Sequence, residues 1–162
     1  MCAAVLHLPV QNCRRCVGPQ RRTHERKNGV PQYTPHPNRV HWDTRYLNYQ
    51  PRSASALLIR WLDRLQPQPN NNRALDVACG TGRNALALAK HGWNVLGADI
   101  SPVALAIARQ EAQAYGVNLN LAALNMDDWP LPHAYFDLIC VFRFLDRALC
   151  AHCLWHSSPA AC

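Results

Sequence analysis

Two aspartates and two glycines form the arrangement in this chain with the clearest chemical meaning. Asp76 precedes the run Cys79-Gly80-Thr81-Gly82, and Asp99 follows farther along, at the end of a second apolar stretch. Glycines in such a loop let the backbone turn sharply and let a ligand approach without a Cβ in the way. A helix that starts there presents unpaired amides to the ligand, and an acidic residue at the next strand end accepts hydrogen bonds from ribose hydroxyls. The spacing therefore predicts a site for an adenosine-containing molecule.

Two cofactor classes fit this loop. The stretch Gly80-Thr-Gly-Arg-Asn-Ala85 satisfies the G-x-G-x-x-G/A pattern of dinucleotide binding, which would make the chain a fragment of an NAD(P)-dependent oxidoreductase. Against this, Asp76 places a carboxylate where a pyrophosphate would be repelled. A carboxylate suits a ligand with a cationic amino group and a sulfonium, so the residues favour S-adenosylmethionine over a dinucleotide.

The elements that must position these residues alternate between strands and helices. Strand and helix signals that follow one another at this length predict an α/β fold with a parallel sheet and right-handed crossovers. Ser53 and Ser101 are expected to cap helices, and Pro102 to occupy a first helical position. We expect helices over 53–65, 84–90 and 102–114, and strands over 74–79, 93–99, 118–123 and 136–142.

The N-terminal part of the chain has a different composition. Residues 1–52 hold nine of the 17 Lys and Arg but only two of the ten acidic residues, so this segment accounts for the net charge of +7. It is rich in proline and lacks sustained apolar periodicity, which predicts a disordered basic tail over residues 1–40. The segment has no aromatic residues between its arginines, which disfavours a nucleic-acid-binding arm. Its prolines disfavour a mitochondrial presequence, so we favour a solvated tail.

In these motifs the chain resembles the class I S-adenosylmethionine-dependent methyltransferases. Asp76-Val-Ala-Cys-Gly-Thr-Gly82 is similar to their first motif, and Val95-Leu-Gly-Ala-Asp-Ile-Ser-Pro102 to the segment that follows it. More narrowly, the chain resembles the small-molecule branch that includes bacterial tellurite-resistance-type methyltransferases. The resemblance covers residues 41–149 and implies a Rossmann-like, doubly wound parallel sheet with strand order 3-2-1-4.

The resemblance also implies which residues hold the cofactor. Asp76 and the loop amides would bind its amino acid portion, Asp99 with Ile100 the ribose and the adenine edge, and Asn125 the adenine amino group. Two positions depart from the family pattern. The family often has an aspartate where this chain has Asn125, and its fullest motif has a glycine where this chain has Ala78. Alanine is tolerable at that position if its φ stays negative. The expected cofactor-binding residues are Asp76, Ala78, Cys79, Gly80, Thr81, Gly82, Asn84, Asp99, Ile100, Asn125, Met126, Asp127 and Phe142.

Each of these polar residues also has a plain structural role available. Asp76 suits a turn cap, Asp99 a helix cap, and residues 125–128 a polar loop. Taken together, the functional interpretation is favoured, because three separate loops place polar groups at the carboxyl ends of consecutive parallel strands, where doubly wound sheets bind ligands.

The acceptor side of the site is less defined. No side chain can be named as a general base, and His133 is a candidate only by residue type. Arg143, between two phenylalanines where the family lines its acceptor pocket, pairs either with an anionic acceptor or with Asp146. Trp42, Tyr46 and Tyr49 resemble an aromatic lid over the cofactor, or pack against the helix that follows, and the phenylalanines beside Arg143 are Phe142 and Phe144.

Eight cysteines raise the question of metal binding and disulfides. The pairs Cys13/Cys16 and Cys150/Cys153 are both C-x-x-C but stand at opposite ends of the chain, whereas zinc modules bring their pairs together, so no metal is predicted. The cysteine density is too low for a disulfide scaffold, which favours a reducing, cytoplasmic location. No apolar run reaches the roughly 18 residues of a spanning helix, so no membrane association is expected.

The family pattern disappears after Leu149. We therefore expect a tail over residues 1–40, a methyltransferase domain over 41–149 and an irregular tail over 150–162, as in a gene product truncated after the fourth strand. That strand would be an exposed edge, which favours dimerisation through it. Two functions remain open: methyl transfer to a small-molecule acceptor, and a binding module that holds the cofactor without turnover.

Overall fold

The computed structural model describes residues 3–7, 36–70, 72–129 and 135–144. Strands and helices alternate along most of this length, as the sequence predicts. In chain order the elements are β1 (Ala3–His7), α1 (Pro37–Tyr46), α2 (Ala56–Leu62), β2 (Arg73–Val77), α3 (Arg83–Lys90), β3 (Asn94–Asp99), α4 (Pro102–Ala114), β4 (Asn120–Ala123) and β5 (Leu138–Phe142).

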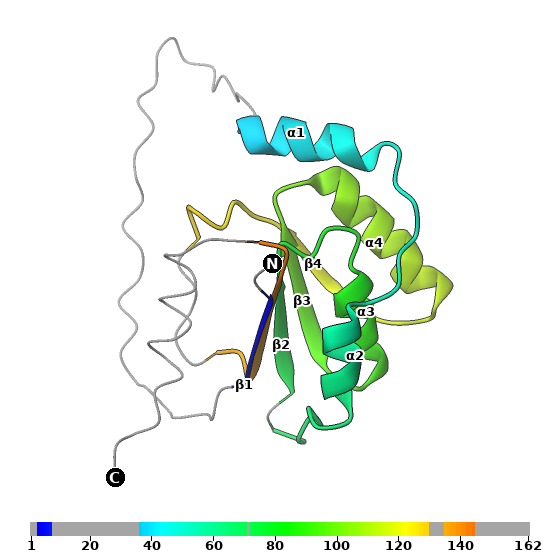
Figure 1. The fold of residues 1–162 in the computed structure, drawn as a ribbon, viewed down its shortest axis with the longest axis vertical. Helices are drawn as coiled ribbons and strands as arrows, with labels where there is room; N and C mark the ends of the chain where they lie inside the picture. The colour runs from blue at the N-terminus through cyan, green and yellow to red at the C-terminus, as the bar shows by residue number, and fades with distance from the viewer. Residues whose placement is uncertain (1–2, 8–35, 71, 130–134, 145–162) are drawn as a thin grey trace.

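The strands form one sheet in the order β1-β5-β2-β3-β4 (Figure 1). β2 pairs in parallel with both β3 and β5, and β3 pairs in parallel with β4. Numbered from the first predicted strand, this is the order 3-2-1-4, so the Rossmann-like α/β prediction is confirmed. The reversal of strand order occurs beside β2, which is where open α/β sheets bind ligands.

The N-terminal strand corrects two expectations. Ala3–His7 pairs antiparallel with β5, with Ala3 opposite Phe142 and His7 opposite Leu138. The prediction that the fourth strand is an unpaired edge is therefore wrong for this structure, and with it the basis for dimerisation through that edge. The interval 1–40 is also not disordered throughout, because it contains β1 and the first turn of α1.

Each face of the sheet has its own apolar core, as the period-2 alternation of a strand requires. On one face, Ala74, Val95 and Leu138 pack with residues of α2 and α3 such as Leu58 and Leu88. Figure 1 shows α2, α3 and α4 together on this side of the sheet. A second layer of helices, expected for a doubly wound sheet, is not among the described residues.

The opposite face carries a separate cluster. Leu75, Val77 and Val141 are all nearly or fully buried there, and they pack with Met126 and Phe136 from the segments around β4 and β5. Because residues adjacent along a strand face opposite sides, Asp76 lies on the helix-covered side, directed toward α3. This alternation sets where each residue of the loop after β2 can reach.

The helix ends follow the capping signals in part. The Ser101 side chain accepts a hydrogen bond from the Ala104 amide at 3.1 Å, and Pro102 begins α4 as predicted. For α2 the N-cap is Ser55, and Ser53 lies outside the helix. No helix in the described part of the chain is long and apolar enough to cross a bilayer.

Candidate functional site

The loop between β2 and α3 forms the floor of the site. Gly80 and Gly82 both have positive φ, at 56° and 75°, a region that glycine enters without steric cost. Gly82 is the N-cap of α3, and its amide donates to the Cys79 carbonyl at 3.0 Å. The loop therefore brings the first turn of a helix up to the carboxyl end of the central strand, as the glycine pattern predicts.

Asp99 stands beside this loop at the end of β3. One carboxylate oxygen accepts the Gly80 amide at 2.7 Å and the other accepts the Ser101 amide at 2.9 Å. Burial raises the pKa of Asp99, and the hydrogen bonds from Ser101 and Gly80 act in the opposite direction. The carboxylate is thus fixed in orientation, with the amides holding it against the glycine loop.

Asp76 lies behind the loop. It is 1% exposed, and its carboxylate accepts the Ala85 amide at 3.1 Å, which ties the end of β2 to the first turn of α3. Burial raises its pKa to about 7, the amide hydrogen bond opposes the shift, and Asp99 adds to it. Its side chain supports the helix terminus, which is the structural role considered for it from the sequence.

Ala78 does not meet the condition set for it. Its φ is 50°, in the left-handed region, where the sequence argument required a negative φ for alanine to be tolerable. A residue with a Cβ in this region is strained, and strain of this kind clusters at ligand-binding sites. The glycine of the family's fullest motif would remove that strain.

A cavity of about 1160 Å³ opens over the loop. Its size is in the range of sites that hold a cofactor together with a small substrate. All but two of the expected cofactor-binding residues line it, the exceptions being Asp76 and Gly82. The expected residues on the cavity wall are Ala78, Cys79, Gly80, Thr81, Asn84, Asp99, Ile100, Asn125, Met126, Asp127 and Phe142.

Two of these lining residues already have partners within the protein. The Asn84 side-chain oxygen accepts the Ser55 amide at 2.8 Å, so it holds the start of α2. The Asn125 side chain donates to Asp128 at 2.8 Å and accepts the Asp127 amide at 3.3 Å. Asn125 therefore organises its own loop while forming part of the cavity wall.

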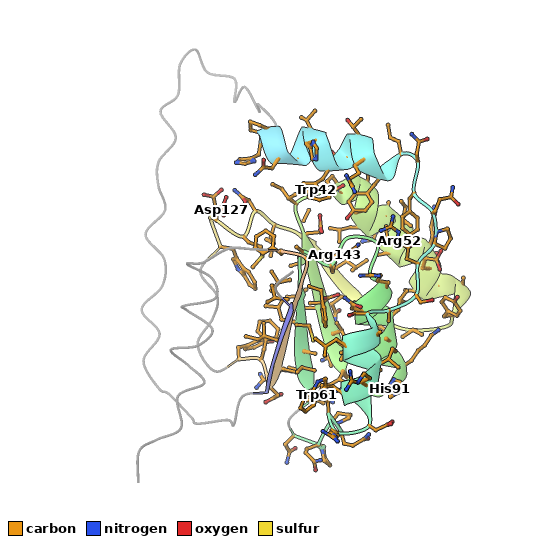
Figure 2. The ribbon with its side chains drawn as sticks, viewed as in Figure 1. Trp42, Arg52, Trp61, His91, Asp127 and Arg143 are labelled. Carbon is orange, nitrogen blue, oxygen red and sulfur yellow. The ribbon has the colours of Figure 1, made fainter. Side chains whose placement is uncertain are left out.

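Helix α1 covers the cavity with aromatic side chains. Trp42 and Tyr46 stack with their ring centroids 6.0 Å apart, and both line the cavity, as does Tyr49. A Cβ placed on Gly80 would lie 2.6 Å from the Tyr46 hydroxyl oxygen, so the glycine is required for this close approach. Figure 2 shows Trp42 on the underside of α1, facing the strand ends. This arrangement supports the lid interpretation of these aromatic residues.

The lid is held onto α4 by polar contacts. The Ser101 hydroxyl donates to the Asp43 carboxylate at 2.5 Å, and the Asp43 Oδ2 lies 3.5 Å from the Arg39 Nε on the same helix.

Burial and the neighbouring Asp99 raise the pKa of Tyr46 to about 12. Tyr46 is therefore protonated at neutral pH and presents a hydroxyl, not a phenolate, to the cavity.

Sequence reasoning missed several residues that line the cavity. Most of them lie on α1 or on the irregular chain after it, and the other two are the first residue of α3 and the residue after β4; nothing in their spacing marked them. Arg143 and Phe144, considered for the acceptor side, do line the cavity. The missed lining residues are Asn38, Arg45, Asn48, Gln50, Arg52, Arg83 and Leu124.

Other candidates lie outside the described residues. These are His133, Asp146 and both C-x-x-C pairs. Within the described ranges no group of three His, Cys, Asp or Glu side chains is placed to hold a metal. Burial raises the pKa of Cys79 and of Cys140, so both thiols remain protonated at neutral pH, as expected of small buried residues.

Comparison with known proteins identifies the family. A methyltransferase domain family matches residues 74–156, and the chain belongs to it. A protein from Geobacillus sp. (strain WCH70), named as a methyltransferase, is 32% identical over 103 residues, which are 64% of this chain and 41% of that protein. The demethylmenaquinone methyltransferase of Thermus thermophilus is 36% identical over 88 residues, 51% of this chain and 40% of the relative.

Among solved structures, TehB from Haemophilus influenzae matches with a TM-score of 0.46 and 20% identity, covering 56% of this chain and 30% of TehB. The chain spans about 40% of the length of the first curated relatives that it matches. The class is that of the class I methyltransferases, whose methyl donor is S-adenosylmethionine, and the recognition made from the two sequence motifs is confirmed.

Proposed function

We propose that this chain binds S-adenosylmethionine in the cavity over the β2–α3 loop and transfers its methyl group to a small-molecule acceptor. The observation that carries the proposal is the position of Asp99. It lies on the cavity wall, 6% exposed, with both oxygens oriented by backbone amides next to a glycine loop. A carboxylate held in this way suits the vicinal hydroxyls of a ribose.

The residues present fit an adenosyl cofactor. Gly80 lines the cavity without a side chain, and Asp99 beside it would accept the ribose hydroxyls. Met126 and Ile100 supply apolar wall for an adenine ring, and the chain at Asn125 and Asp127 supplies polar edges. The N-terminal turn of α3 directs its amides toward the amino acid portion, where the helix end favours a carboxylate.

The cofactor supplies a methyl group on a sulfonium, which is already a good leaving group. The protein then contributes positioning and exclusion of water. In this chain those tasks fall to α1, whose Trp42 and Tyr46 cover the cavity, and to Phe142, which is 7% exposed at the cavity wall. No histidine is among the described residues that line the cavity, and none of the described side chains is assigned here as a general base.

An NAD(P)-dependent oxidoreductase is disfavoured. Asp76 lies buried behind the loop, and Asp99 faces the cavity. Asp99 suits the ribose of either cofactor and does not separate the two, whereas a carboxyl group at Asp76, next to the loop, is unfavourable for a pyrophosphate. The family match points in the same direction.

Methyl transfer from isotopically labelled S-adenosylmethionine across a panel of phenols, thiols, amines and oxyanions tests the proposal. Competition by S-adenosylhomocysteine, with no competition by NAD, is the expected result. Binding of the donor with no transfer to any acceptor would support the binding module instead. Binding of NAD without any binding of S-adenosylmethionine would exclude both.

We also propose a domain organisation and a cellular location for this chain. We assign the methyltransferase domain to residues 41–149, with α1 adding residues from Pro37 and the family match extending it to residue 156. A cytoplasmic location is consistent with the free thiols of Cys79 and Cys140. Fractionation of cells that produce the full chain, with a thiol-labelling assay on each fraction, checks this location.

A further inference from the structure

Arg143 occupies a strained position at the cavity. It follows β5 directly, and its φ is 60°, in the left-handed region that residues with a Cβ rarely adopt. Besides Ala78 it is the other non-glycine residue with positive φ in the described chain, and both line the same cavity. Backbone strain of this kind persists where the surrounding structure holds it, and it concentrates at ligand sites.

The Arg143 side chain also lacks a partner among the described residues. It is exposed at the cavity and has no hydrogen bond or ion pair with any described group, whereas the lining residue Arg83 donates to the Ser53 carbonyl at 2.9 Å. Arg45 is likewise engaged, 5.6 Å from the centroid of the Trp42 ring. A guanidinium beside a cavity that has no partner among the described residues is an available site for a carboxylate.

The surroundings of Arg143 indicate the shape of what it would bind. Phe142 and Phe144 flank it along the chain, and Trp42 closes the cavity from above. In Figure 2, Arg143 lies at the carboxyl ends of the strands beneath α1, with Trp42 above it and Arg52 to one side. The acidic lining residues, Asp99 and Asp127, are assigned above to the ribose and adenine region. The acceptor region of the cavity is therefore aromatic and positively charged.

We propose that the methyl acceptor is an aromatic or similarly flat molecule that carries a carboxylate, and that Arg143 binds this carboxylate. The inference rests on the proposed function, because it assigns to the acceptor the part of the cavity that the cofactor leaves open. Positive charge there adds to the repulsion that a cationic acceptor would feel from the sulfonium, so the site selects anionic over cationic acceptors.

Calorimetry on the full chain saturated with S-adenosylhomocysteine tests this with a matched pair of probes, 4-hydroxyphenylacetate and 4-hydroxyphenylacetamide. The two probes share size and shape and differ in charge. We expect the parent to bind the carboxylate at least about tenfold more tightly than the amide, as for a charge-assisted hydrogen bond. Equal affinities, or no binding of the carboxylate at millimolar concentration, would overturn the proposal.

The variant Arg143→Gly separates binding from folding. Glycine relieves the positive φ, so the variant should unfold at the same or a higher temperature than the parent while losing the preference for the carboxylate probe. Arg143→Lys should retain part of the preference, and Arg60→Gln, which removes an exposed arginine of α2, should retain all of it. Loss of stability in Arg143→Gly with an unchanged preference would show a structural role and overturn the proposal.

Three further outcomes separate a failure of the Arg143 assignment from a failure of the proposed function. If Arg52→Gln removes the preference and Arg143→Gly does not, the carboxylate is bound elsewhere in the cavity and this inference is wrong. If S-adenosylhomocysteine itself does not bind the parent chain, the proposed function fails. If S-adenosylhomocysteine binds and the two probes bind equally, the proposed function stands and only the assignment to Arg143 is rejected.

Discussion

The substitution Asp76→Asn tests the electrostatic state of the carboxylate behind the glycine loop. In the folded chain the pKa of Asp76 is raised from 3.8 to about 7, chiefly because burial removes its water. Asparagine has the same shape, and its side-chain oxygen can still accept the hydrogen bond from the Ala85 amide. The variant therefore removes the ionisation of this residue and little else.

The sign of the effect follows from the direction of the shift. Between its unfolded and folded pKa values, Asp76 is ionised in the unfolded chain and still protonated in the folded chain. Raising the pH through this interval therefore favours unfolding, and the loss is complete once the pH exceeds the folded pKa. Between about pH 5 and about pH 8, only the part below the folded pKa of about 7 contributes. That part spans roughly two pH units, which at about 1.4 kcal/mol per unit amounts to about 3 kcal/mol.

Urea unfolding of both proteins at the two pH values measures this difference. The parent should lose about 3 kcal/mol more stability than Asp76→Asn on going from acidic to alkaline buffer. Asp99, whose pKa is also raised, is present in both proteins and cancels in the comparison. The exposed Asp63, replaced by Asn, serves as the control and should follow the parent. An equal loss in parent and Asp76→Asn would refute the conclusion that this carboxyl group is desolvated.

Three other substitutions, two in the loop and one in α1 above it, have defined outcomes. Ala78→Gly relieves a φ of 50° and should raise the free energy of unfolding by about 1 kcal/mol, measured by urea unfolding; a lower stability would contradict the strain argument. Gly80→Ala brings a Cβ to 2.6 Å from the Tyr46 hydroxyl and should cost about 1–3 kcal/mol of stability, part of which the double variant with Tyr46→Phe should restore. Tyr46→Phe alone should leave the shape of the pH–rate profile unchanged between about pH 7 and pH 10, because the pKa of Tyr46 is about 12; a lost alkaline limb in that interval would show that the tyrosine titrates during the reaction.

The central part of the fold could be predicted because local signals and global topology agree there. Ser101 and Pro102 mark the start of α4 where the structure has it, and the glycine run marks the turn into α3. The apolar strands that flank these turns have little alternative to a parallel sheet, since helices of this length connect them. The strand order followed from the resemblance and is confirmed by the pairing.

The segments that could not be predicted depend on contacts between distant parts of the chain. β1 is five residues long and pairs with a strand more than a hundred residues away, so nothing local distinguishes it from the basic tail that follows. A hint was available in the predicted unpaired edge, which favours recruitment of any short apolar segment within reach.

The candidate site, too, was predicted only in part. Residues of the glycine loop and the strand ends were found because backbone geometry restricts their type. The lining arginines Arg45 and Arg52 were missed because their role depends on where α1 lies over the sheet, which no periodicity encodes. Asp76 was identified as important, but its placement behind the loop follows from the two-residue alternation of β2 and its hydrogen bond to Ala85.

The most direct test of the account is the affinity of S-adenosylmethionine for the parent chain and for Asp99→Ala, measured by calorimetry under identical conditions. The parent should bind this ligand, and the variant should bind it roughly 10- to 100-fold more weakly. The reason is that the Asp99 carboxylate, oriented by the Gly80 amide at the cavity wall, would no longer accept the hydrogen bonds of the two ribose hydroxyls. Asp63→Asn should bind as the parent does, and circular dichroism should show that Asp99→Ala is folded. An affinity for S-adenosylmethionine that is unchanged in a folded Asp99→Ala would contradict the assignment of this cavity to an adenosyl methyl donor.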